Sequence, residues 1–191
     1  MRGETKEFDI DFMVGKTFDK IYLSENRSET YYITEFFNMD GSPVHTRADD
    51  NYYNDNHLIY QNLDNLPKYD YCHRVASTSF YNQCVIFKND SETVFFSHDQ
   101  ECCECVKFES IDIPFEQLQG HKILSAKCRT VLKKDKDGYG DERSTWYIFE
   151  VEGVGTATMR WSGESNGWYS TMVDVYYQDD RIYNDWCKNI N

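Results

Sequence analysis

Proline, basic side chains and long apolar runs are all scarce in this sequence. Only three of the 191 residues are proline, and 20 lysines and arginines stand against 33 aspartates and glutamates, so the formal net charge is −13. A surface this acidic repels nucleic acid and anionic membranes, and we expect direct binding to neither. The chain does not open on an apolar run and has no apolar stretch of membrane-spanning length. We therefore expect no signal peptide, no membrane span and a cytoplasmic protein in a bacterial host cell.

Aromatic residues and cysteines, by contrast, are plentiful. Aromatic side chains make up 16% of the chain and hydrophobic residues 40%, which is enough to bury a core and favours sheet over helix. Seven cysteines are an odd number in a chain for which we expect no export. Because the cytosol keeps thiols reduced, we expect free thiols rather than a disulfide framework.

Short alternating segments separated by turn residues predict the fold class. We expect one α+β domain over residues 1–191, mostly antiparallel β, as a compact single sheet, a sandwich or a partial barrel with one or two short helices. A long insertion is expected at about residues 38–80. Between residues 121 and 131 the alternation predicts a strand whose buried face carries Leu124, Ala126, Cys128 and Thr130.

The insertion is polar, rich in tyrosine and without a clear period. Tyrosines displayed on a polar loop are good contact residues, because they bury a large area at a small entropic cost. The alternative is a loop that folds its own tyrosines inward. As partner-binding residues we predict Asp49, Asp50, Tyr52, Tyr53, Asp55 and Tyr60.

One short run, from His98 to Ile111, places an imidazole, three thiols and several carboxylates together. Zinc favours thiolate and imidazole ligands, so His98, Cys102, Cys103 and Cys105 are ligands on paper. However, adjacent residues of an extended strand point to opposite faces, which sets Cys102 and Cys103 apart. The nearby acids also raise thiol pKa values and oppose a nucleophilic cysteine. We expect no bound cofactor, no catalytic residue, and packing and hydrogen-bonding roles for this run, with zinc as the alternative.

A glycine-flanked segment, Gly163 to Gly167, is the second candidate. Its two glycines permit positive φ, and Ser165 and Asn166 are residues that cap local backbone. If its hairpin meets the cysteine run, Glu164 lies near Glu101 or Glu104, and the paired carboxylates can bind a cation or exchange protons. The simpler interpretation is a tight turn.

Together the two stretches resemble a family. The sequences His98-x-Gln-Glu-Cys-Cys-Glu104 and Arg160-Trp-x-Gly-Glu-Ser-Asn-Gly-x-Tyr-Ser170 are similar to a small domain of unknown function seen mainly in phages, prophages and some bacteria. The resemblance covers residues 12–24 and 83–177, and Cys105 departs from the family pattern. It implies a phage-like origin, a compact β-rich fold and a cytoplasmic setting, and it implies no activity.

These observations favour a binding protein over an enzyme. We expect an acidic inhibitor that docks on a basic, nucleic-acid-binding surface of a host defence protein such as a CRISPR effector. The alternative is a small metal- or ligand-binding domain, with hydrolysis as its candidate activity. That domain would be built from His98, Cys102, Cys103, Glu104 and Glu164.

Overall fold

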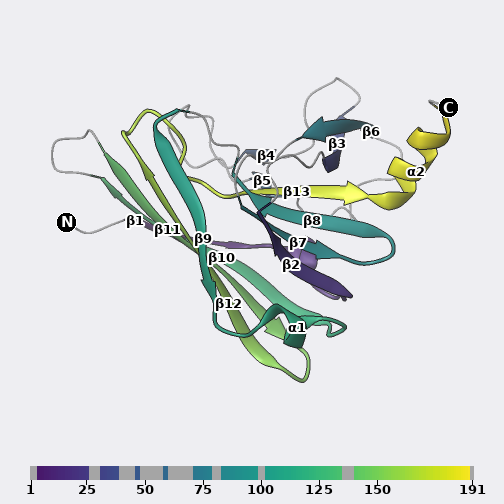
Figure 1. Ribbon diagram of the computed structural model, residues 1–191, viewed down its shortest axis with the longest axis horizontal. Coiled ribbons are helices and arrows are strands. Elements are labelled where there is room, and N and C mark those ends of the chain that lie inside the picture. The colour runs from purple at the N-terminus through teal and green to yellow at the C-terminus, as the bar shows by residue number, and fades with distance from the viewer. Residues whose placement is uncertain are drawn as a thin grey trace.

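The computed structural model of the protein consists mainly of antiparallel β-strands, arranged in two larger sheets and two small pairs (Figure 1). This confirms the mostly antiparallel β architecture predicted from the alternating segments. The structure describes residues 4–25, 31–38, 46–47, 58–59, 71–78, 83–98, 102–134 and 140–189.

The larger sheet has five strands, and its three central strands are the longest of the described strands. In spatial order the strands are β1 (Glu4–Asp9), β10 (Ile123–Lys134), β11 (Asp141–Val151), β12 (Gly155–Ser165) and β9 (Glu104–Ile111). Strand β11 alternates strictly between buried and less buried positions, as a strand with one face on a core must. Its buried side chains at 145, 147, 149 and 151 point the same way as those of β12.

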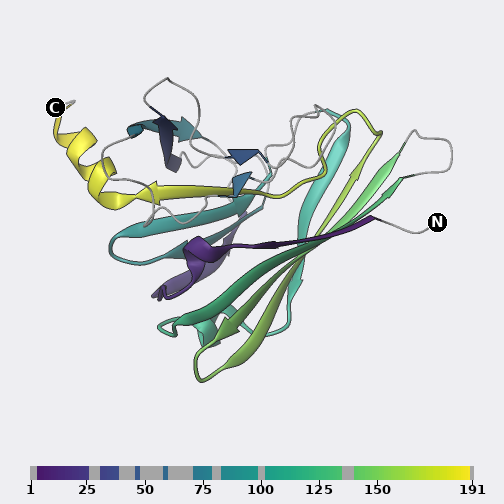
Figure 2. The same ribbon diagram turned by 180° about the vertical axis from the view of Figure 1, so that it is seen from behind.

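The second sheet has four strands and is joined by smaller elements. In spatial order its strands are β13 (Asp174–Asp179), β8 (Glu92–Ser97), β7 (Cys84–Lys88) and β2 (Lys20–Ser24). The two-stranded pairs are β3 (Tyr31–Asn38) with β6 (Tyr71–Thr78), and β4 (Thr46–Arg47) with β5 (Leu58–Ile59). In both views the β3–β6 pair lies beyond β13, on the side away from the five-stranded sheet (Figures 1 and 2).

Helical segments are short. They are a 3-10 turn η1 (Asp11–Met13), α1 (Phe115–Leu118) and the C-terminal α2 (Asp180–Asn189). The two α-helices agree with the one or two short helices that the sequence predicts. Within the described ranges, no helix combines the length and the apolar character that crossing a membrane requires.

The core lies between the two larger sheets and draws side chains from both. Phe87 and Phe96 of the four-stranded sheet meet Tyr147 and Phe149 of the five-stranded sheet. The ring centroids are 4.7 Å apart for Phe96 and Tyr147 and 5.4 Å apart for Phe87 and Phe149. Each such buried ring contributes about 1.5–3 kcal/mol relative to an exposed one, so these contacts hold the sheets face to face.

One predicted core position is wrong. Ala126, Cys128 and Thr130 are buried as expected, but Leu124 is 46% exposed. The pairing of β10 with β11 shifts between Ile123 and Ser125, which is a β-bulge. An extra residue at a bulge reverses the alternation on one side of it, so Ile123 takes the buried place and Leu124 turns outward.

Candidate functional site

His98 lies at the end of β8 and points into the molecule. In β8 Val94 and Phe96 face the core, and His98, two residues further, continues that face with only 4% of its surface exposed. Its Nδ1 atom lies 2.6 Å from the backbone oxygen of Met172. Because a carbonyl oxygen only accepts, Nδ1 carries the proton and donates it.

The second ring nitrogen of His98 faces a buried carboxylate. Its Nε2 atom lies 3.6 Å from Oε1 of Glu104 and has no hydrogen-bond partner among the residues that the structure describes. On the other side of the ring, Oδ2 of Asp174 lies 3.9 Å from Nδ1. The imidazole is therefore held between β9, β13 and the segment before β13, so it connects the two large sheets at one end of the core.

Glu104 begins strand β9 and turns its side chain inward, where only 1% of that side chain is exposed. Its Oε2 atom accepts a hydrogen bond of 3.2 Å from the backbone N–H of Cys103. A buried carboxylate is costly unless it is paired and hydrogen-bonded, and the hydrogen bond from Cys103 is one of the contacts that offset this cost.

The two motifs of the sequence do meet, because β9 pairs with β12. Ser165 lies opposite Glu104, and Glu164 lies opposite Cys105. The backbone N–H of Asn166 also donates a 3.2 Å hydrogen bond to the carbonyl of Cys103. Glu164 is nevertheless exposed while Glu104 is buried, because neighbouring register positions face opposite sides of a sheet. The meeting of the hairpins therefore does not bring these two carboxylates onto one face.

Gly163 serves close packing and not the turn. It lies within β12 and is not one of the glycines with positive φ, whereas Gly167, with φ +84°, is in the turn itself. A Cβ atom on Gly163 would sit 2.5 Å from the backbone oxygen of Thr171. The segment before β13 therefore crosses the sheet directly over Gly163, and only glycine leaves room for it.

The turn after β12 is closed by side chains of the predicted kind. Oγ of Ser165 accepts from the N–H of Gly167 at 3.1 Å, and Oδ1 of Asn166 accepts from the N–H of Trp168 at 3.1 Å. These are local Ser and Asx turns of the sort that such residues favour. The roles of Ser165 and Asn166 are thus local backbone contacts, and the Trp168 that follows them is 72% exposed.

A buried arginine, absent from the sequence-based candidates, completes this end of the core. Arg143 is 5% exposed. Its Nε donates to Oγ1 of Thr171 at 3.0 Å and its Nη1 to Oγ1 of Thr130 at 3.4 Å. Thr130 in turn lies 3.4 Å from Oγ1 of Thr145. The alternation of β11 could have predicted this burial. Arg143 lies two residues before Thr145 and therefore on the same face of the strand as Thr145 and the buried aromatic residues after it.

The six cysteines whose side chains the structure describes are free thiols, and they include both buried and exposed residues. Cys102, Cys103 and Cys105 are exposed, whereas Cys128 is buried. The Sγ atoms of Cys102 and Cys103 lie 3.2 Å apart. The hydrogen bond with Cys102, with smaller effects of desolvation and of the charge on Glu104, raises the pKa of Cys103 above its ordinary value of 9.0. A thiol with a raised pKa is a poor nucleophile at neutral pH.

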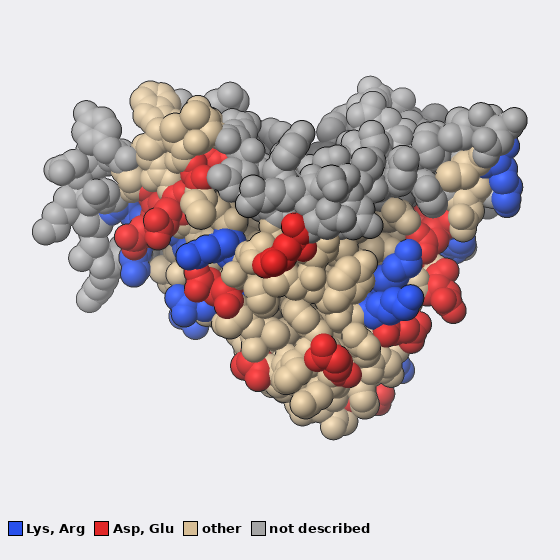
Figure 3. Space-filling view, viewed as in Figure 1, with Lys and Arg blue, Asp and Glu red and all other residues tan. Residues whose placement is uncertain are grey.

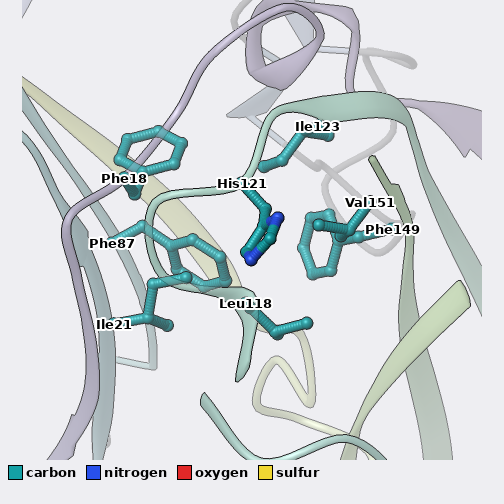
Figure 4. Close-up of a pocket in the computed structure, with 8 residues that line it drawn as sticks. All are labelled: Phe18, Ile21, Phe87, Leu118, His121, Ile123, Phe149 and Val151. Atoms are coloured by element: carbon teal, nitrogen blue, oxygen red, sulfur yellow. The ribbon is translucent and has the colours of Figure 1, made fainter. Parts of the chain in front are cut away.

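Two cavities in the described part of the chain bear on these residues. One adjoins the glycine-flanked segment, measures about 370 Å³ and is lined by Lys133, Lys134, Gly140, Asp141, Glu142, Glu164 and Ser165. The other cavity, shown in Figure 4, lies between the sheets, is lined by His121 and seven apolar side chains, and measures about 10 Å³. That is about the space of one water molecule, and its apolar walls offer a water few partners. Among the described residues, no group of three or more His, Cys, Asp and Glu side chains is placed to hold a metal ion.

The outer face of the five-stranded sheet carries a cationic and aromatic row. Trp146 lies directly opposite Arg160 on β12 and Arg129 on β10. The guanidinium carbons of Arg129 and Arg160 lie 5.9 Å and 6.0 Å from its ring centroid, within cation–π range. Arg129 also lies 3.9 Å from Glu7. On the coloured part of the face seen in Figure 3, acidic and basic side chains are interspersed.

The six predicted partner-binding residues all lie outside the described residues. They are Asp49, Asp50, Tyr52, Tyr53, Asp55 and Tyr60. Their role stays a prediction. The described parts of the expected insertion are β4, β5 and β6.

Comparison with known proteins gives a family and nothing beyond it. No curated protein and no solved structure matches the chain significantly. A family model described as a domain of unknown function, DUF7448, matches residues 56–175. The match includes His98, the cysteine run and the glycine-flanked segment, and it begins inside the expected insertion, whereas residues 12–24 lie outside it. Because the match spans more than half of the sequence, the chain belongs to the DUF7448 family.

Proposed function

We propose that this chain is a protein-binding module of phage or prophage origin, which docks on the basic, nucleic-acid-binding surface of a host defence protein. CRISPR effectors are the class of target that we name. The observation that carries the proposal is the net charge of −13 on 191 residues. A protein so charged is attracted to the same surfaces that attract nucleic acid, and it competes for them.

The buried position of His98 and Glu104 favours this proposal over the hydrolytic alternative. Both side chains are at least 94% buried and contact each other or the backbone. A general acid or base must come within hydrogen-bond reach of its substrate, and these groups are enclosed by the two sheets. Glu164, the remaining member of that alternative, lies on the other face of the sheet.

The docking surface that we propose is the acidic, tyrosine-rich segment between residues 49 and 60. Carboxylates steer the encounter with a basic surface, and tyrosines then supply buried contact area. Such a complex weakens as salt is added, because exposed charges beyond about 8 Å are screened at physiological ionic strength.

The test is competition against DNA for a purified CRISPR effector nuclease. The full chain should reduce DNA binding and cleavage at low salt, and the inhibition should weaken as salt rises. The variant Asp49→Asn, Asp50→Asn, Asp55→Asn should weaken inhibition by roughly 10-fold or more, as expected when several interface charges are lost. Tyr52→Ala with Tyr53→Ala should act in the same direction.

A matched control removes the same number of carboxylates elsewhere. The variant Asp19→Asn, Glu116→Gln, Glu150→Gln alters exposed residues of the described sheets and connections. It should inhibit as well as the unaltered protein if the contacts are local. An equal loss of inhibition in both variants would mean that net charge, and not the segment between residues 49 and 60, causes the inhibition. If a panel of effectors binds DNA equally well with and without the protein, the proposal is overturned.

A further inference from the structure

We infer that Cys102 and Cys103 form a two-sulfur chelating site for a soft, thiophilic ion of the class of trivalent arsenic or cadmium. The inference stands on the exposed thiols and is independent of the docking surface proposed above. Thiolates are the protein ligands that soft ions select over oxygen and imidazole.

The first step is the direction of the two side chains. In an extended strand adjacent side chains point to opposite faces, which would separate the sulfurs. Here both residues precede β9, in a bend, and their Sγ atoms lie 3.2 Å apart. Both residues are also exposed, so an ion reaches them without any opening of the core. The expectation that Cys102 and Cys103 are set apart is therefore wrong.

The second step is the fixed backbone beneath the pair. The N–H of Cys103 donates to the buried carboxylate of Glu104, and its carbonyl accepts from the N–H of Asn166, each at 3.2 Å. Both polar groups of this residue are thus held by neighbouring elements, one on β9 and one in the turn after β12. A site whose ligands are already positioned loses less entropy on binding than one that must form around the ion.

The third step compares chelation with oxidation of the same pair. A disulfide brings two sulfurs to about 2.05 Å and prefers Cα atoms at least about 4.4 Å apart. Adjacent residues joined by a trans peptide have Cα atoms only about 3.8 Å apart, so a bond between Cys102 and Cys103 is strained. Two thiolates on a tetrahedral ion, with bonds of about 2.3 Å, lie roughly 3.8 Å apart. The two sulfurs, observed 3.2 Å apart, have to separate only slightly to reach that distance. Pyramidal trivalent arsenic holds its two sulfurs closer together than a tetrahedral ion does.

The site has two protein ligands in the part of the chain that the structure describes. There, no group of three or more ligating side chains gathers around one point. Cys105 is also exposed, and it lies on β9 opposite Glu164. Cys105 follows Glu104 directly in the strand, so its side chain points to the opposite, outer face. It is therefore the matched control for Cys102 and Cys103.

The reaction with a trivalent arsenical balances without an oxidant. Phenylarsine oxide reacts with both thiols. Two arsenic–sulfur bonds form, the arsenic–oxygen bond breaks, and the oxygen leaves as water with the two thiol protons. Cadmium instead displaces the two protons, so its binding should strengthen as the pH rises.

The experiment titrates the reduced full chain with phenylarsine oxide and measures intact mass. We expect one phenylarsenic group per chain, bound through two sulfurs. A chelate resists competing monothiols because the second bond is intramolecular, so mercaptoethanol should release it only at roughly 100-fold higher concentration than it releases a one-sulfur adduct. Cys102→Ser and Cys103→Ser should each lose this resistance, while Cys105→Ser should keep it.

Cadmium provides the second arm, followed by the ultraviolet absorption of the cadmium–thiolate bond. It should bind one ion per chain with the same dependence on the two cysteines. The substituted residues are exposed, and circular dichroism will show that the variants fold. A resistant adduct in Cys103→Ser, a lost adduct in Cys105→Ser, or equal release from all proteins would each overturn the inference.

Discussion

The run from His98 to Cys105 contains two sets of residues that differ in their exposure to solvent. His98 and Glu104 point between the sheets and are buried, whereas Cys102, Cys103 and Cys105 remain exposed. The residues are neighbours in sequence, but the bend before β9 and the alternation of β9 send them to opposite sides. Proximity of reactive residue types along a chain is therefore no sign of a common site. The inner set stabilises the fold, and the outer set is available for chemistry.

The largest effect that separates the two sets is expected from Glu104→Ala. This change removes the carboxylate that faces Nε2 of His98 and that accepts from the N–H of Cys103. Removing a buried acceptor leaves its donor unpaired, which costs about 1–3 kcal/mol and more when the acceptor is charged. We expect a fall of that size in the free energy of unfolding, measured by urea denaturation.

The control for this change is Glu164→Ala, one residue from the position that pairs with Glu104 but on the exposed face. It should change the free energy of unfolding by less than about 0.5 kcal/mol. Glu104→Gln should recover part of the loss, because an amide oxygen still accepts from Cys103. Similar losses at Glu104 and Glu164 would mean that burial does not divide their roles.

A smaller effect is expected where the inner set meets the segment before β13. In Gly163→Ala the new Cβ would lie 2.5 Å from the carbonyl oxygen and 2.9 Å from the Cβ of Thr171. The backbone has to move, and overpacking of this kind costs about 1–3 kcal/mol. The thermal midpoint should fall accordingly, while Thr156→Ala, at an exposed position of the same strand, should leave it nearly unchanged. An unaltered midpoint in Gly163→Ala would show that the segment is not tightly packed there.

Local alternation predicted much of this fold. The hairpin of β11 and β12 and the buried positions Ala126, Cys128 and Thr130 follow from a period of two, since each strand has one face on the core. The exception at Leu124 arose from a bulge, which depends on pairing with another strand and leaves no trace in a single segment.

The candidate site was predictable only in part. The turn roles of Ser165 and Asn166 are local, so their residue types were sufficient. Gly163 was taken for a turn residue because the close approach of Thr171 depends on where a later segment crosses. The direction of Cys102 and Cys103 likewise depends on where β9 begins, because the two residues lie in the bend just before Glu104, its first residue.

A third test contrasts a buried thiol with an exposed one. Burial raises the pKa of Cys128 from its ordinary 9.0 to about 12. Its contribution to stability is therefore complete below pH 9 and is lost as the pH rises from about 9 toward 12, because the unfolded chain deprotonates first. The free energy of unfolding should fall by about 1 kcal/mol per pH unit in this range on account of Cys128 alone.

Substitution isolates that contribution from those of buried tyrosines, whose pKa values are also raised by burial. Cys128→Ala should lower stability at every pH and should flatten its decline above pH 9. Cys105→Ala, at an exposed position, should leave the slope as it is. Parallel slopes in the protein and in Cys128→Ala would contradict the raised pKa.

The smallest effect is expected on the outer face, where solvent screens each charge. The hydroxyl of Ser162 donates to Glu109, and this hydrogen bond, followed by the contact with Lys107, lowers the pKa of that carboxyl below its ordinary 4.5. The stabilisation is therefore present above pH 4.5 and is lost as the pH falls through the lowered value. Ser162→Ala should move the pKa of Glu109 upward in an NMR titration and change the free energy of unfolding by less than about 0.5 kcal/mol. Lys107→Met should move the pKa the same way by a smaller amount, because its contribution ranks below that of the hydroxyl. A clear titration shift with almost no change in stability is what distinguishes this face from the one that holds Glu104, where the same loss of one contact reaches the whole fold.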